Sequence, residues 1–279
     1  DLPVRYRVGQ FNRENVSKIE DEWQSIKTAI EPAATLVNQF GVNEKTLTSR
    51  NAVIPIAYYF KETGLTIDEL QRNDETYYRT KQDIKKWLLT SLLNGTFSGN
   101  ADTVLRTVRE VLRETEDDEF PLETINEEVG DLNKIVGFTD EIAENVLEYK
   151  KGSKRTFLAL SLLYPEHDWG SVQPHQDHIF PAARLEEEYL REEGFSEDEI
   201  QMFTEESDKL ANLQLLTEGE NTAKQDAPFE TWVTDQNEGF YDRHFIPKDS
   251  KYHRLENFDK FVERRRQMIK DHLISVLSG

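Results

Sequence analysis

Cysteine is absent from the chain, and this absence removes two kinds of structure at once. No disulfide can form, and no metal ion can be held by thiolate ligands. A chain that uses no disulfide is typical of reducing compartments, so we expect a cytoplasmic protein. Its folded state must then depend on packing and on polar contacts between side chains.

Long apolar runs are missing as well. The longest is Phe157 to Tyr164, with Ser161 inside it, whereas a helix that crosses a membrane needs about 20 apolar residues. No secretory signal is readable. A length of 279 residues is enough for about two domains, each with a core of its own.

Apolar residues recur with a helical period through the first half of the chain. The longest predicted helices there are Glu20 to Phe40 and Tyr77 to Leu93, and Asn94-Gly95 stops the second of them. We therefore predict a mainly α protein in which residues 1–152 form a helical domain, ended by a turn near Lys151-Gly152-Ser153. Residues 153–279 are predicted to form a second, α+β domain.

Three short blocks in this second domain carry the polar residues of interest. They are Asp177–Pro181 (DHIFP), Asn212–Leu216 (NLQLL) and Asn221–Lys224 (NTAK). The first two have the character of short strands, and the third begins a helix. An acidic residue next to a histidine is thus followed by an apolar strand and then by an asparagine and a lysine one helical turn apart.

The residue types in these blocks suit metal-assisted cleavage of a phosphodiester, which needs an activated water and a cation beside the phosphate. His178 can be the general base, because its neutral form is populated near pH 7. Asp177 and Asn221 are hard oxygen donors for Mg²⁺ or Mn²⁺. Lys224 would share a helix face with Asn221 and meet the scissile phosphate. Asn212 completes the predicted catalytic set by tying the loop before the second strand.

The order of these blocks resembles the ββα-metal site of HNH endonucleases, where a hairpin carries the base and the next helix carries a metal ligand. More narrowly, Asp177–Pro181 and Asp208–Val233 resemble the C-terminal nuclease domain of GmrSD-type restriction proteins, a group that includes phosphorothioation-linked phage-defence nucleases. In that group a ParB-like NTPase domain comes first. Its signatures are not visible here and the chain starts at Asp1, so the resemblance implies a C-terminal fragment with such a domain as its partner.

Two departures from compact HNH modules need explanation. The strands are separated by an acidic insertion, residues 185–208, which is predicted to form two short helices broken at Gly194. Ser196 and Glu199 have the spacing of a capping box for the second helix. Glu220 stands where the resemblance implies a zinc-binding cysteine in many HNH modules, so helix packing must hold the fold instead.

Two further residues are candidates for the site. Arg265 lies within the apolar stripe of a helix predicted between Glu256 and Leu277, so its guanidinium should be partly buried and directed at a scissile phosphate or a structural carboxylate. His175 would share a strand face with Asp177 and diverge from His178. It could contact a phosphate, bind the metal, support Asp177, or serve only the fold.

The charge of the chain has the opposite sign to the one that DNA binding normally uses. Lys and Arg total 34 against 54 for Asp and Glu, a net charge of −20, whereas DNA binding normally uses an excess of cations. A salt-adapted source, DNA binding by the preceding domain, or autoinhibition by the acidic insertion would each explain it. Net charge does not fix local chemistry.

We therefore predict a metal-dependent HNH endonuclease that nicks double-stranded DNA by His-activated water attack, in restriction of phage or modified foreign DNA. One such site cuts one strand, so double-strand breaks would need two sites or a homo-oligomer. Two alternatives remain open. One is a non-catalytic DNA- or protein-binding module with a vestigial HNH fold, and the other is an acidic DNA mimic that binds a basic partner.

Overall fold

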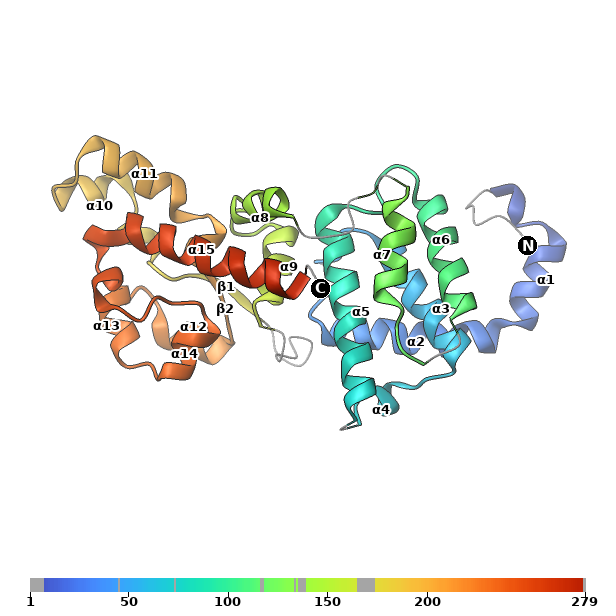
Figure 1. Cartoon of the computed structure of the whole chain (residues 1–279). Helices are drawn as coiled ribbons and strands as arrows, with labels where there is room; N and C mark the ends of the chain where they lie inside the picture. Colours follow the sequence, from blue (N-terminus) through green and yellow to red (C-terminus); the bar gives the residue numbers. More distant parts are fainter. Residues whose placement is uncertain are drawn as a thin grey trace. The chain divides into compact units, whose positions relative to one another are not determined.

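The computed structural model describes residues 8–44, 46–72, 74–115, 118–132, 134, 139–164 and 174–277 (Figure 1). Over these residues the protein is mainly helical, with one small antiparallel sheet, as the sequence predicts. The chain divides into two compact units, Asp1–Gly137 and Phe138–Gly279. No helix in the described ranges is long and apolar enough to cross a membrane.

The first unit is a helical bundle. Its α-helices are α1 (Arg13–Asp21), α2 (Trp23–Gln39), α3 (Val53–Thr63), α4 (Ile67–Leu70), α5 (Glu75–Asn94), α6 (Ala101–Glu114) and α7 (Leu122–Gly130). Helix α3 packs against α2 and α6, and α6 packs against α7. The fully buried residues include Ile56, Leu88, Val108 and Ile125. This core is apolar, as the helical periodicity predicts.

The helix boundaries in this unit follow local chemistry. Helix α5 contains the predicted range and ends at Asn94, where Gly95 caps it with a φ of 62°, the left-handed conformation that glycine adopts without strain. Asp74 caps its first turn by accepting a hydrogen bond from the backbone of Thr76 at 2.9 Å. The helix predicted over residues 20–40 is instead divided, because α1 ends at Asp21 and α2 begins at Trp23.

The second unit surrounds the small sheet with helices. Strand β1 (His175–His178) pairs antiparallel with β2 (Leu213–Leu216), in a register that sets Asp177 opposite Gln214. The α-helices are α8 (Asp140–Leu147), α9 (Lys154–Leu162), α10 (Glu187–Glu192), α11 (Glu197–Ser207), α12 (Glu218–Lys224), α13 (Phe229–Thr234), α14 (Glu238–Arg243) and α15 (Phe258–Leu277). Helix α12 follows β2 directly and packs against both strands.

An aromatic core fixes the end of β1. The ring of Phe180, two residues after His178, lies with its centroid 4.7 Å from that of Phe229, 5.1 Å from that of Phe258 and 4.9 Å from that of Phe261. Phe258 and Phe261 belong to α15 (red in Figure 1). The long C-terminal helix therefore anchors the strand end that carries the polar residues.

The acidic insertion has the predicted form. Helices α10 and α11 make up a lobe at one end of the second unit (Figure 1). Gly194, with a φ of 89°, separates them, and Ser196 and Glu199 form a complete capping box at the start of α11. The insertion therefore folds as a local helical pair between the two strands.

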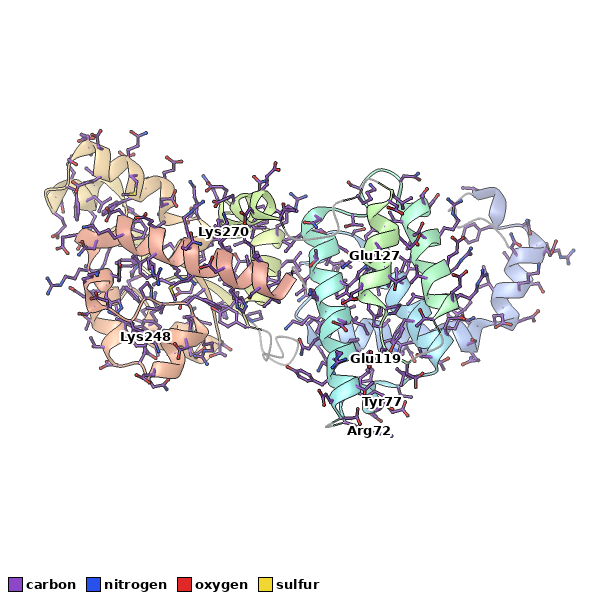
Figure 2. All side chains as sticks on the ribbon, in the orientation of Figure 1. Arg72, Tyr77, Glu119, Glu127, Lys248 and Lys270 are labelled. Atoms are coloured by element: carbon purple, nitrogen blue, oxygen red, sulfur yellow. The ribbon has the colours of Figure 1, made fainter. Side chains whose placement is uncertain are left out.

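The two units meet between Gly137 and Phe138, whereas the sequence predicts the boundary at residue 152. Helix α8 belongs to the second unit because α15 packs against it. Arg266 of α15 donates to Glu148 at 2.7 Å, and Lys270, labelled in Figure 2, donates to Glu144 at 2.9 Å. The turn at Gly152 exists, with a φ of 83°, but it lies inside the second unit.

Candidate active site

Asp177 is held on β1 by two neighbours that both bind the same carboxylate oxygen. The side-chain amide of Gln214, directly opposite on β2, donates to its Oδ2 atom at 3.0 Å. The ammonium of Lys224 lies 2.9 Å from that same oxygen. Only 15% of the Asp177 side chain is exposed. Among the described residues no hydrogen bond reaches Oδ1, so one oxygen is fixed and the other remains for a ligand.

His178 is buried at the end of β1, with both ring nitrogens engaged. Its Nε2 lies 2.7 Å from Oδ1 of Asp208, and its Nδ1 lies 3.1 Å from Nζ of Lys151. An ammonium can only donate a hydrogen bond, so in the neutral ring Nδ1 is the acceptor and Nε2 carries the proton that is donated to Asp208. The lone pair that could accept a proton is therefore on Nδ1.

The pKa of His178 is lowered from its ordinary value of 6.5. Burial is the main cause, since it disfavours the charged ring, and the hydrogen bond to Asp208 opposes it. The positive charge of Lys151 lowers the pKa further. His178 is thus neutral near pH 7, as a general base must be.

Asp208 and Lys151 were not found by sequence reasoning. Asp208 is the residue that ends α11, so the acidic insertion supplies the partner of His178. Lys151 lies in the turn before α9, and its backbone N–H donates to the carbonyl of Asp208 at 2.9 Å. Both residues sit in charged runs typical of solvated surface, and only the three-dimensional contact distinguishes them.

Helix α12 begins with a capping box and is clamped by an ion pair. Thr217 and Glu220 exchange hydrogen bonds at its first turn. Glu220 also accepts from Arg243 at the end of α14, at 2.9 Å. Burial opposes a lowered pKa at Glu220, but the bonds from Thr217 and Arg243 outweigh it. These contacts hold the helix where the resemblance implied a zinc clamp, and they orient the helix that carries half-buried Asn221.

Residues 133–271 match the family model of the C-terminal domain of GmrSD restriction endonucleases. The match contains β1, β2, α12 and the insertion, and it runs into α15. This half of the chain belongs to the GmrSD family. The predicted resemblance is thereby confirmed. A search of curated proteins gave no match.

Lys224 of the GmrSD domain has a different position from the predicted one. Its side chain is only 1% exposed, its ammonium donates to the carbonyl of His178 at 2.5 Å, and it lies over the ring of Trp232. We expected this ammonium to meet a scissile phosphate. It instead binds Asp177 and the backbone of His178, because the face of α12 that carries it turns towards β1 rather than to solvent.

Asn212 is fully buried and has a structural role. Its Oδ1 accepts from the backbone N–H of Phe180 at 2.9 Å, and its Nδ2 donates to the carbonyls of Phe180 and Ser207 at 3.1 and 2.8 Å. The predicted loop tie is present in the GmrSD domain. Because both amide hydrogens bind the backbone and the side chain is fully buried, Asn212 is not placed to contact a substrate.

Arg265 is also fully buried, which corrects both predicted partners. Its guanidinium donates to the carbonyls of Leu210, Ala211 and His244, at 2.7 to 3.2 Å. Burial lowers its pKa to about 10, so it remains charged near pH 7. It binds no carboxylate of the described residues and is not exposed to solvent, since main-chain oxygens before β2 and after α14 accept its hydrogen bonds.

Three other histidines of the domain are His175, which is a predicted site residue, and His244 and His253, which are not. His175 is half-buried on the same strand face as Asp177, as predicted. His244 is buried and its Nδ1 lies 2.8 Å from the hydroxyl of Tyr164, which also accepts from the backbone N–H of Leu215 on β2. His253 is buried against the carbonyl of Pro247 at 2.8 Å. The last two are held by contacts within the fold.

The described part of the GmrSD domain has no cluster of three or more His, Asp or Glu side chains placed to hold a metal. Such a cluster is not required for Mg²⁺, which keeps several waters and takes one or two protein oxygens beside a substrate phosphate. Asp177, with one oxygen unused by its described neighbours, and Asn221 have the required donor chemistry. Both residues therefore carry the kind of oxygen donor that a hard cation takes.

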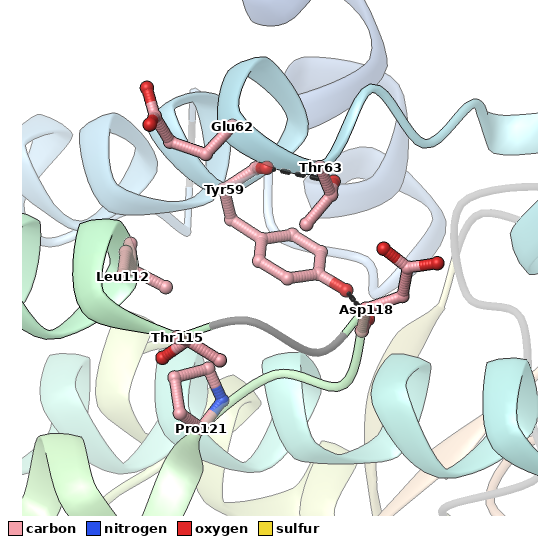
Figure 3. Close-up of a pocket in the computed structure, with 7 residues that line it drawn as sticks. All are labelled: Tyr59, Glu62, Thr63, Leu112, Thr115, Asp118 and Pro121. Carbon is pink, nitrogen blue, oxygen red and sulfur yellow. Dashed lines mark hydrogen bonds between the residues drawn. The ribbon is translucent and has the colours of Figure 1, made fainter.

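A cavity in the first unit offers no competing site. It has a volume of about 110 Å³ and is lined by Tyr59, Glu62, Thr63, Leu112, Thr115, Asp118 and Pro121 (Figure 3). The hydroxyl of Tyr59 points at Asp118 and donates to its carbonyl. Pockets for organic ligands are usually about 300 Å³ or more. Burial raises the pKa of Tyr59, so this phenol has no acid–base role near neutrality.

Proposed function

We propose that the second unit is a metal-dependent DNA endonuclease of the HNH type. The observation that carries the proposal is the arrangement around His178: a buried neutral imidazole at the end of a strand, with a carboxylate on one ring nitrogen and the adjacent Asp177 fixed on one oxygen. The domain belongs to a family described as restriction endonucleases, which supports DNA as the substrate.

Asp177 and Asn221 are the residues that would hold Mg²⁺ or Mn²⁺. When bound, the ion supplies positive charge that stabilises the phosphorane and the leaving 3′ oxygen. Gln214 and Lys224 hold the carboxylate of Asp177 in one orientation through its Oδ2 atom. Because the carboxylate is already held, Asp177 loses less conformational entropy when a ligand binds.

His178 removes the proton from the attacking water. Its Nδ1 accepts the proton while the water oxygen forms a bond to phosphorus and the bond from phosphorus to the 3′ oxygen breaks. Asp208 holds Nε2–H, so it fixes the tautomer and stabilises the imidazolium that forms. The leaving oxygen takes a proton from solvent, and the products carry 5′-phosphate and 3′-hydroxyl ends.

Conversion of supercoiled plasmid to the open-circular form tests the proposal. We expect nicking by the 279-residue chain in Mg²⁺ or Mn²⁺ and none in EDTA. His178→Ala should lower the rate by about 10²- to 10⁴-fold, the usual contribution of a general base. His178→Ala must keep its circular dichroism and melting temperature for the comparison to hold. Equal traces of nicking from both proteins would refute the proposed function and favour a vestigial fold or a DNA mimic.

The proposed role is restriction of phage or modified foreign DNA. Its test is the plating efficiency of phage on cells that express the chain, beside cells that express the chain with His178→Ala. Restriction that persists in the variant would separate any defence role from this site.

A further inference from the structure

A short basic segment lies beside the site in an otherwise acidic protein. Residues 150–155 read Lys-Lys-Gly-Ser-Lys-Arg, with four cations and no carboxylate, in a chain of net charge −20. We call it the basic turn. The side chains of Lys150, Lys151, Lys154 and Arg155 belong to exposed residues. The local excess of positive charge is therefore presented to solvent.

The backbone of the basic turn is fixed to the strands that carry the site. The N–H of Gly152 donates to the side chain of Gln176 on β1 at 2.9 Å. The N–H of Lys151 donates to the carbonyl of Asp208 at 2.9 Å, and the hydroxyl of Thr156 donates to the carbonyl of Lys150 at 2.5 Å. Its cations thus have a defined position relative to Asp177 and His178.

Lys151 connects the basic turn to the reacting atom. Its Nζ lies 3.1 Å from Nδ1 of His178, the nitrogen that would take a proton from water. A water attacking a phosphate must lie within hydrogen-bond distance of that nitrogen. The scissile phosphate would consequently come within a few ångströms of the place where the ammonium of Lys151 now lies.

Ion pairs within the described ranges do not account for three of these charges. Within the described ranges, Lys150, Lys151 and Arg155 form no ion pair with a carboxylate, whereas Lys248 and Lys251, also exposed, pair with Asp242 and Asp249 at 2.8 Å. Two of the four cations also lie in the first turn of α9, where the helix dipole disfavours positive charge. An anionic partner would compensate both effects.

We propose that the basic turn binds the DNA backbone and that Lys151 transfers from His178 to the scissile phosphate. This inference rests on the proposed function for its substrate. Phosphates flanking the cut contact Lys150 and Arg155. Because Lys151 leaves Nδ1 when it meets the phosphate, DNA binding uncovers the nitrogen that accepts the proton from water. The acidic net charge is then no obstacle, since the cations are concentrated where the backbone passes.

DNA binding in EDTA tests the basic turn without any cleavage. The experiment measures fluorescence anisotropy of a labelled 20-base-pair duplex over a series of salt concentrations, with the unsubstituted chain and with Lys150→Ala/Arg155→Ala. Each lost phosphate contact should reduce the slope of log K against log salt by about 0.9. We expect the double variant to bind about 10-fold more weakly at low salt, with a slope smaller by about 2.

The matched control is Arg254→Ala/Lys260→Ala, which removes two exposed cations elsewhere in the same unit. It makes the same change in net charge, and we expect its affinity to stay within about twofold of the unsubstituted chain, with the salt slope unchanged. Equal weakening by both pairs would show a general charge effect and overturn the inference. So would unchanged binding in the double variant, or no binding by the unsubstituted chain at low salt.

Lys151 has a separate test. Lys151→Ala should lower kcat for nicking by about 10- to 100-fold with a smaller change in KM, because the contact strengthens in the transition state. Lys151→Arg, which keeps the charge, should restore part of the rate. If the parent nicks DNA and the basic-turn variants nick it at the same rate, the inference is overturned and the proposed nuclease function stands. If the variants lose DNA binding but the parent never nicks DNA, the result supports DNA binding by the basic turn and refutes the proposed function.

Discussion

The two units of the chain treat polar and apolar side chains in opposite ways. In the first unit the buried polar residues are mostly threonine and serine, with Lys85 as the charged exception, and several large apolar side chains are exposed, among them Trp23. In the second unit His178, Lys209, Lys224 and Arg265 are all buried, and the large exposed apolar residues of the described chain all belong to the first unit. The first unit therefore has the usual apolar core, whereas the second unit buries charged side chains, which costs desolvation free energy.

Burial of charge is explained by what each charged group contacts. Lys224 binds Asp177 and the carbonyl of His178, and Arg265 binds carbonyls at the entry to β2. Lys209, next to Asp208, pairs with Glu148 at 2.8 Å and Glu206 at 2.7 Å. Each cation supports a segment that carries a site residue. The cost of burial is thus concentrated around the site, which is expected where function requires a fixed polar geometry.

Replacing Arg265 should have the largest effect on stability. Arg265→Met keeps much of the volume but leaves carbonyls of Leu210, Ala211 and His244 without their donor, so we expect a loss of about 3–5 kcal/mol. Urea denaturation of the second unit measures it. Arg264→Met, at an exposed neighbouring position, is the control and should change stability by less than about 0.5 kcal/mol. Equal effects at both positions would break the contrast between buried and exposed charge.

The apolar core of the first unit should affect stability but leave the chemistry unchanged. Leu88→Ala on α5 removes a fully buried side chain and should cost about 2–5 kcal/mol. Below its melting temperature the variant should nick plasmid at the parent rate. Leu215→Ala, fully buried on β2, is the counterpart that should lower both stability and nicking. A loss of nicking in Leu88→Ala while the variant is folded would mean that the first unit shares in catalysis.

Asp208 sharpens the comparison because its side chain is exposed and yet is expected to affect the nicking rate. Its side chain is 56% exposed, so Asp208→Asn should change stability by less than about 0.5 kcal/mol. The amide binds the Nε2–H of His178 less well and can stabilise the wrong tautomer, so the nicking rate should fall by about 10- to 100-fold. Glu192→Gln, at an exposed position of the same insertion, should leave the rate unchanged. Activity equal to the parent in Asp208→Asn would remove Asp208 from the site.

Local patterns in the sequence predict much of the fold. The periodic stripe of α15, the capping box of Ser196 and the stop at Gly95 each depend on residues within a few positions of one another. The order of strand, insertion, strand and helix around Asp177 and His178 is also readable, because each block has its own pattern.

Long-range contacts are what the sequence does not predict. The spacing of Asn221 and Lys224 indicates a shared helix face but not the direction in which the Lys224 side chain points, and the structure turns it towards β1. Asp208 and Lys151 meet His178 only because three segments converge there. A carboxylate in an acidic run and a lysine in a basic one carry no local signal of such a contact.

The smallest expected effect comes from the ion pairs that join the α8 region to α15. It is a dependence of the free energy of unfolding on pH. Hydrogen bonds and charge from Lys270 and Arg266 lower the pKa of Glu144. Burial opposes a lowered pKa at Glu148, but Lys209 and Arg266 outweigh it. A carboxylate with a lowered pKa stabilises the fold above its unfolded value near 4.5, and that contribution is lost as pH falls through the folded value.

Urea midpoints at pH 7, 5 and 4 measure this contribution against a matched variant. The parent should lose stability below about pH 4.5 by more than Glu144→Gln/Glu148→Gln does, with a difference of about 1 kcal/mol or less because both carboxylates are about half exposed. Glu192→Gln/Glu193→Gln, which removes two exposed charges of the insertion that form no ion pair among the described residues, should keep the parent's pH dependence. If that control flattens the curve as much, general repulsion among acidic residues governs acid stability, and the paired carboxylates of the second unit have no special part in it.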